Sequence, residues 1–91
     1  MSNKSEIEKL ENNNAELAKE ILLNEAAIYE TEKEMSEIET QLLEHPKIQQ
    51  YVNNLRLLVD RIKLKNQLYK NEIFQNDLEI AKLRKEDNDN E

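Results

Sequence analysis

Side chains that could carry chemistry are few in this sequence. It has no cysteine, no glycine and a single histidine, His45. His45 stands beside Pro46, and no helix-spaced pair of carboxylates accompanies it, so the sequence predicts no metal site. A cysteine nucleophile and a glycine-rich phosphate loop are impossible, and no serine has a suitable general base nearby. We therefore expect no enzyme activity, no cofactor and no small-molecule substrate.

Basic residues gather in the second half of the chain and raise the question of nucleic acid. Residues 47–85 hold 9 basic and 4 acidic residues, a net charge of +5, whereas residues 1–45 hold 4 basic and 12 acidic residues, a net charge of −8. The basic residues lie around a helix without interleaved aromatic residues, and the whole chain carries −7, so we expect no nucleic-acid binding. Opposite charges instead indicate that the two halves pair with each other.

The first half of the chain is predicted to form one long helix over residues 5–43. Ser5 and Glu8 fit a capping box, which places the helix start at Ser5. Core-type positions then alternate in spacings of three and four, and 8 of these 11 positions are apolar: Ile7, Leu10, Asn14, Leu17, Ile21, Asn24, Ile28, Thr31, Met35, Ile38 and Leu42. A seam this narrow is typical of a coiled coil, because an ordinary surface helix has a wider apolar stripe.

Pro46 interrupts this pattern and precedes a second helix, predicted over residues 46–85. Proline breaks a helix interior but fits the first helical position, so the turn is placed at 44–46. In the second seam 9 of 11 positions are apolar: Ile48, Val52, Leu55, Val59, Ile62, Asn66, Tyr69, Ile73, Asn76, Ile80 and Leu83. Residues 86–91 are acidic and have nothing to bury, which predicts a disordered tail after a single domain over 1–85.

Folding the two seams against each other brings asparagine to asparagine. Every core layer then pairs residues whose numbers add up to 90, so that Asn24 faces Asn66 and Asn14 faces Asn76. Facing amides can hydrogen-bond to each other, whereas a buried asparagine facing an apolar side chain loses its hydrogen bonds. We predict that these four asparagines set the register. Coiled-coil cores also tolerate polar residues that have no such role, and that alternative stays open.

These patterns predict an all-α fold in which two long helices form an antiparallel coiled-coil hairpin. The antiparallel direction is favoured by charge, because it sets Glu11, Glu25, Glu32 and Glu39 beside Arg56, Lys63, Lys70 and Arg84. An antiparallel dimer of two long helices crossing near Pro46 would form the same layers between chains. We prefer the hairpin, because closing a short loop costs less than association.

Apolar residues outside the seam form an outer stripe on each helix. These predicted partner-binding residues are Leu22, Tyr29, Leu57, Leu64, Leu68, Phe74 and Leu78. A two-helix rod has only a thin core, so the stripes predict further packing into a four-helix bundle or a larger complex. The partner would be a second copy of the chain, forming a dimer, or another helical protein.

The expected role is that of a non-catalytic coiled-coil structural or adaptor subunit that mediates protein assembly through the outer stripe. The alternative is a regulatory inhibitor or antagonist that occupies a groove of its partner with one helix. No apolar run is long enough to span a membrane, and residues 1–9 lack the apolar segment of a signal peptide. We therefore expect a soluble intracellular protein, cytoplasmic or nuclear, without membrane insertion.

Overall fold

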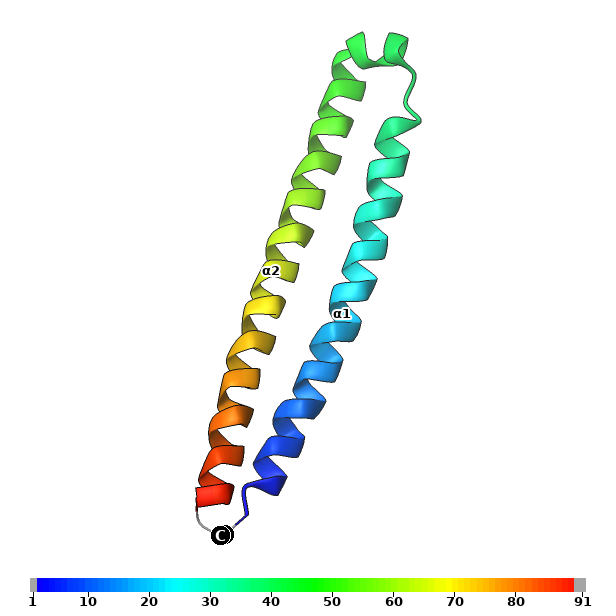
Figure 1. The fold of residues 1–91 in the computed structure, drawn as a ribbon. Helices are drawn as coiled ribbons and strands as arrows, with labels where there is room; N and C mark the ends of the chain where they lie inside the picture. Colours follow the sequence, from blue (N-terminus) through cyan, green and yellow to red (C-terminus); the bar gives the residue numbers. More distant parts are fainter. Residues whose placement is uncertain (1, 90–91) are drawn as a thin grey trace.

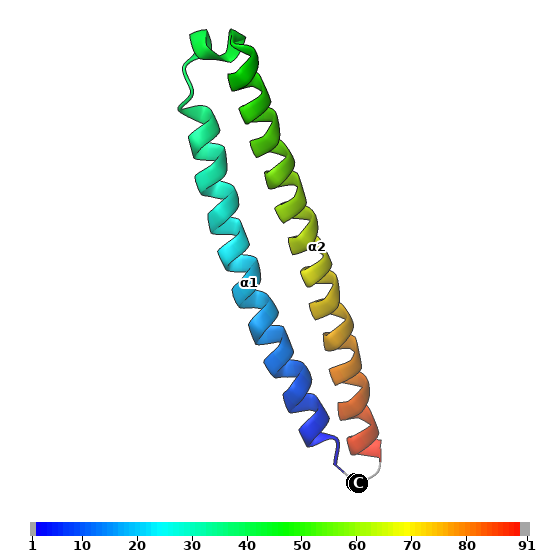
Figure 2. The ribbon, with the colours of Figure 1, turned by 180° about the vertical axis from the view of Figure 1, so that it is seen from behind.

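The chain folds back on itself as an antiparallel helical hairpin. The computed structural model describes residues 2–89, with helix α1 over Lys4–Ser36, a short 3₁₀ helix η1 over Thr40–Glu44 and helix α2 over Pro46–Asp89. Figure 1 shows α1 and α2 side by side, with η1 at one end of the molecule, and Figure 2 shows the same arrangement from behind. The hairpin is a rod with extents of 70 × 14 × 13 Å. The predicted fold class is confirmed.

A single row of side chains from each helix forms the core. In α1 the residues with reduced exposure lie between Ile7 and Met35, and all occupy seam positions. In α2 every predicted seam position from Ile48 to Leu83 is buried or half-buried. The most buried apolar side chains are Leu17, Ile21, Val52, Val59, Ile80 and Leu83, with exposed fractions of 4% to 8%. Burial therefore follows the alternating spacing of three and four that characterises a coiled coil.

The first helix ends at Ser36 and not at Leu43, so this predicted boundary is wrong. At this end the Ser36 hydroxyl and the Glu37 backbone N–H both donate hydrogen bonds to the Lys33 carbonyl oxygen, at 2.7 and 3.1 Å. Glu39 then adopts an extended conformation, with φ −62° and ψ 139°. The connection between the helices covers residues 37–45 and is longer than the predicted turn at 44–46.

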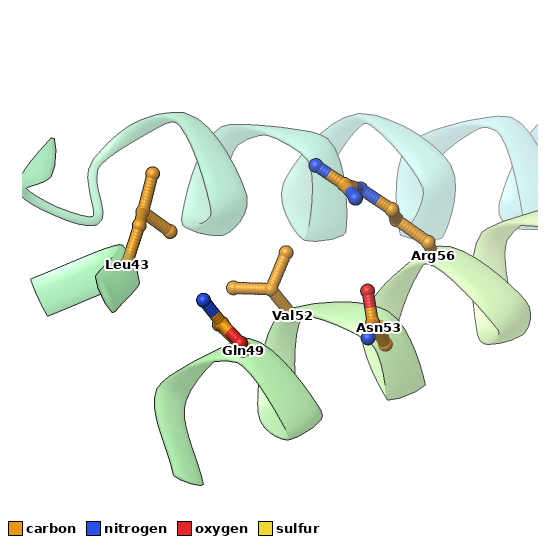
Figure 3. A pocket seen from close by; sticks show the side chains of 5 residues that line it. All are labelled: Leu43, Gln49, Val52, Asn53 and Arg56. Carbon is orange, nitrogen blue, oxygen red and sulfur yellow. The ribbon is translucent and has the colours of Figure 1, made fainter. Parts of the chain in front are cut away.

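The helix η1 changes which leucine closes the seam. The sequence assigns Leu42 to the last layer, but this side chain is 49% exposed. Leu43 is less exposed, at 37%, and lines a hollow with Gln49 and Val52 at the end of the seam (Figure 3). A 3₁₀ helix turns every three residues, so the coiled-coil spacing cannot continue through η1.

Helix α2 begins at Pro46, and the residue before it has the conformation that a proline at the first helical position favours. His45 is extended, with φ −76° and ψ 126°, the conformation that a following proline favours. Its Nδ1 accepts a hydrogen bond from the backbone N–H of Lys47 at 3.2 Å. Its carbonyl oxygen accepts another from the backbone N–H of Gln49 at 2.9 Å. His45 thus caps the second helix.

The opposite end of the rod holds a layer that the sequence did not predict. Helix α1 begins at Lys4 after Asn3, so Ser5 lies inside the first turn and the predicted capping box is wrong. The Asn3 backbone N–H donates to both carboxylate oxygens of Asp87, at 3.0 and 3.1 Å. The Asn3 amide nitrogen donates to the Leu83 carbonyl oxygen at 3.3 Å. Asn3 and Asp87 therefore form one further layer between the helices, beyond the layer of Ile7 and Leu83.

The acidic segment after Lys85 is helical as far as the structure describes it. Residues 86–89 belong to α2, which corrects the prediction of a disordered tail, and residues 90–91 lie outside the described part of the chain. Carboxylates at a helix C-terminus oppose its dipole, but Asp87 lies beside the N-terminus of α1, where negative charge is favourable. The antiparallel neighbour therefore allows α2 to continue.

Candidate functional site

The layer of Asn24 and Asn66 contains the most buried polar side chain within residues 2–89, that of Asn66. The Asn24 amide nitrogen donates to the Asn66 amide oxygen at 2.8 Å. The Asn66 amide nitrogen donates in turn to the carbonyl oxygen of Ile21 at 3.2 Å. Asn66 is only 5% exposed, and no buried side-chain nitrogen or oxygen within residues 2–89 lacks a partner. The two residues therefore meet with the geometry that a register-setting pair requires.

The layer of Asn14 and Asn76 also forms a two-bond chain. The Asn76 amide nitrogen donates to the Asn14 amide oxygen at 2.8 Å, and the Asn14 amide nitrogen donates to an Asp77 carboxylate oxygen at 2.9 Å. The sequence pairs the asparagines but does not indicate Asp77. Asp77 could have been identified from the sequence, because it immediately follows Asn76 and so lies on the flank next to the seam.

Charged flanks accompany the seam on the side that the sequence indicated. Arg84 forms an ion pair with Glu11 at 2.8 Å, and Lys63 forms one with Glu32 at 3.5 Å. Within residues 2–89 the other two predicted pairs, Glu25 with Lys70 and Glu39 with Arg56, do not form ion pairs; Glu39 lies in the extended connection. All four paired side chains are about half exposed, so they contribute little stability and mainly favour the antiparallel direction.

The opposite flank carries a contact that sequence reasoning missed. The Tyr51 hydroxyl donates a hydrogen bond to a Glu34 carboxylate oxygen and joins the two helices near the connection. This bond to the carboxylate, with smaller contributions from burial and from the charge of Glu34, raises the pKa of Tyr51 above its ordinary value. On the same helix the Lys65 ammonium lies 5.7 Å from the centre of the Tyr69 ring. The spacing rule for apolar seams includes Tyr69 but would not single out Tyr51, Glu34 or Lys65.

All seven predicted partner-binding residues lie on the surface. The leucines of α2 are 52% to 63% exposed: Leu57, Leu64, Leu68 and Leu78. Leu22, Tyr29 and Phe74 are 60% to 66% exposed. Further exposed apolar residues outside the predicted partner-binding set are Leu23, Tyr51 and Leu58, together with Leu42 and Leu43 in the connection.

The helical spacing divides these residues among different faces of the rod. A residue turns by about 100° along a helix, so Leu57, Leu64, Leu68 and Leu78 lie roughly 130° to 170° away from the α2 seam. They face away from α1. Leu22 and Tyr29 lie about 130° from the α1 seam, toward the flank with the ion pairs, and Phe74 approaches that flank from α2. The spacing therefore separates the four α2 leucines from Leu22 and Tyr29, whereas Phe74 lies one turn before Leu78 at the edge of the leucine-bearing face.

We call the far face of α2 its outer row. It consists of the twelve positions Lys47, Gln50, Asn54, Leu57, Arg61, Leu64, Leu68, Asn71, Gln75, Leu78, Lys82 and Lys85. All twelve are exposed. The row holds four leucines, four basic residues and four amides. It therefore combines apolar and polar side chains on a surface outside the core of the hairpin.

Within residues 2–89, no group of three His, Asp or Glu side chains is placed to bind a metal ion. Neither helix, over the same residues, has an apolar stretch long enough to cross a membrane. Comparison with protein-family models, with curated proteins and with solved structures found no match. The outer row of α2 is thus the surface on which a functional proposal can be built.

Proposed function

We propose that this chain is a non-catalytic structural or adaptor subunit that binds helical partners through the outer row of α2. The observation that carries the proposal is the set of four leucines on one face of one helix, each more than half exposed. Single exposed leucines are ordinary, but leucines that share one side of a helix are typical of helices that pack against a partner.

The thin core supports the same proposal. Within residues 2–89 only six apolar side chains are buried, and none of them is completely shielded from solvent. A small domain with so little buried area is marginally stable on its own, and a partner that binds the folded state stabilises it by mass action. Binding at the outer row would therefore add to the stability of the rod as well as connect it to an assembly.

The experiment replaces two neighbouring leucines of the row, in the variant Leu64→Glu with Leu68→Glu. At a docked interface this change removes apolar burial and places two carboxylates in a desolvated contact, costing a few kcal/mol. We expect loss of oligomer mass by light scattering, or loss of a co-purifying partner, with most of the helical circular dichroism retained.

A matched control makes the same chemical change outside the row. Leu23→Glu with Leu58→Glu also replaces two exposed leucines and alters the net charge equally. We expect this control to keep the mass and partners of the unmodified chain, because surface substitutions usually change stability by only tenths of a kcal/mol. If the row variant also keeps mass, melting temperature and partners, the row is ordinary surface and the proposal is wrong.

A second candidate function is an inhibitor that inserts one helix into a groove of its target. It is favoured by one observation, that the outer row belongs entirely to α2 and faces away from α1. The two functions differ in the free state. An adaptor subunit is fully helical before it binds, whereas a helix-donating inhibitor gains helicity on binding, which circular dichroism with and without the partner distinguishes.

A further inference from the structure

We propose that the outer row of α2 binds the same row of a second copy of the chain, so that two hairpins form a dimer through parallel α2 helices in register. This inference rests on the proposed function and names the partner at that surface. It follows from the position of the row, from the charges beside it and from its length.

The position of the row restricts how copies of the chain can join. The four leucines of the row face away from α1, which lies against the opposite side of α2. A contact between this row and α1 of a second copy would leave that copy's own row free for a third chain, so it would build an open array. Only a contact of row with row closes on itself as a twofold dimer. The closed form covers both rows with two chains.

Charge in the middle of the row is complementary between two parallel copies. The row repeats the coiled-coil spacing of three and four residues, and in a heptad of its own Arg61 takes position a and Leu64 position d. Asp60 then takes the flanking position g, and Lys65 takes the flanking position e. In a parallel coiled coil a g residue lies beside the next a and e residues of the other helix. Asp60 of each copy therefore meets Arg61 and Lys65 of the other, which gives four pairs of opposite charge.

Asp60 also supplies what the burial of Arg61 requires. Arg61 lies one turn from Leu57 and from Leu64, so a helix that covers these leucines also covers its guanidinium group. A guanidinium group removed from water needs an acceptor, and Asp60 of the second copy provides one. All four side chains are exposed in the single hairpin, so they are available for the contact.

The other layers of the row match in the parallel register. Each residue faces its own copy, so the leucines form four leucine layers and the amides form four amide layers, like the asparagine layers of the seam. Lys82 has Glu79 and Glu86 one turn away on its own helix, and these carboxylates offset the contact of like charges. Lys47 and Lys85 lie at the two ends of the row, where solvent screens their charges.

An antiparallel contact of the two rows is less favourable. The alignment that pairs Leu57 with Leu68 leaves only two layers of leucine with leucine, because the other leucines of the row then face basic residues. It also brings Arg61 and Lys65 of both copies onto one flank, while Asp60 lies on the other flank. The charges that attract in the parallel dimer repel in the antiparallel one.

The row is long enough for a specific dimer. From Lys47 to Lys85 it spans about 57 Å at a rise of about 1.5 Å per residue, and a helix presents a strip about 10 Å wide. The contact would bury roughly 1,100 Å² counted over both chains, which exceeds the ~1,000 Å² expected of a specific interface.

The test uses the full chain. Light scattering should give twice the chain mass of 10.8 kDa, and Leu64→Glu with Leu68→Glu should return it to the mass of one chain. The register is tested with Asn54→Cys and Asn71→Cys, because the chain has no other cysteine. The two variants are oxidised in a glutathione buffer, each alone and as a mixture in which one of them is isotope-labelled.

In the parallel register each cysteine variant should form a disulfide with its own kind and none with the other. An antiparallel register would form only the mixed disulfide, because Asn54 then faces Asn71. Asn12→Cys makes the same change at an exposed position of α1 and should form no disulfide. Mass spectrometry distinguishes the three dimers by the isotope label.

Removing the carboxylate tests the central contact. Asp60→Asn should raise the dissociation constant of the dimer about tenfold by sedimentation equilibrium, because four charge pairs are lost. Glu72→Gln removes one negative charge from the same helix at a flanking position that faces Gln67 of the second copy, so it should leave the dissociation constant unchanged. A long-range effect of net charge would move both variants equally.

The results separate this inference from the proposed function. A mixed disulfide alone, or equal effects of Asp60→Asn and Glu72→Gln, overturns the parallel dimer and leaves the row as a docking surface. A single-chain mass at every concentration also overturns the dimer, and the proposed function is then wrong only if Leu64→Glu with Leu68→Glu keeps every co-purifying partner. A dimer that this double variant leaves intact overturns both.

Discussion

The two asparagine layers differ in where their hydrogen bonds end. The chain from Asn24 through Asn66 ends on the backbone carbonyl of Ile21, whereas the chain from Asn76 through Asn14 ends on the side chain of Asp77. In both layers an amide that would be costly to bury alone has a specific acceptor. Sliding one helix along the other would break these bonds, so the layers favour one register.

The register role predicts opposite effects of single and double substitution. Asn24→Leu removes the donor to the Asn66 oxygen and should reduce the free energy of unfolding in urea by about 1 to 3 kcal/mol. Changing Asn24 and Asn66 both to Leu should restore or raise stability, while it permits other pairings and a changed oligomer mass. Asn12→Leu, at an exposed position of α1, is the control. A double variant with unchanged mass and one register would show that the asparagines do not set it.

At the scale of the elements, the seam could be predicted and the helix ends could not. The alternation of three and four residues from Ile7 to Met35 is a property of many residues, so single errors do not disturb it. The end of α1 at Ser36 is not marked by the seam spacing, and its start is bonded to Asp87, which is distant in sequence. A capping rule that uses only neighbouring residues chose Ser5 because it could not include the partner helix.

The link between Asn3 and Asp87 predicts that the start of α1 and the end of α2, which lie at the same end of the rod, fray together. Asp87→Ala removes the acceptor for the first backbone N–H of this end and a negative charge beside the start of α1, and should cost about 1 kcal/mol. Amide hydrogen exchange should accelerate in the first turn of α1 as well as in the last turn of α2. Asp89→Ala makes the same change at an exposed position two residues later and serves as the control. Equal exchange rates in the two variants would contradict the link.

At the scale of the whole molecule, the hairpin separates its two kinds of surface. The core and the paired flanks lie between the helices, and the outer row lies on the far face of α2. The sequence predicts that apolar residues remain outside the seam, because they do not fit its spacing. It does not show that Leu22 and Tyr29 face another direction, because their heights along the rod coincide with those of the row while their angles differ.

The central claim is that one chain forms the antiparallel hairpin by itself and leaves the outer row free for a partner. Spin labels at Glu8→Cys and Lys85→Cys test it directly, because both positions are exposed and the chain has no other cysteine. Pulsed electron paramagnetic resonance should give one short distance between the labels. That distance should persist when labelled chains are diluted with an excess of unlabelled chains. A long distance, or a short one that fades on dilution, would contradict the hairpin and indicate helices exchanged between two chains.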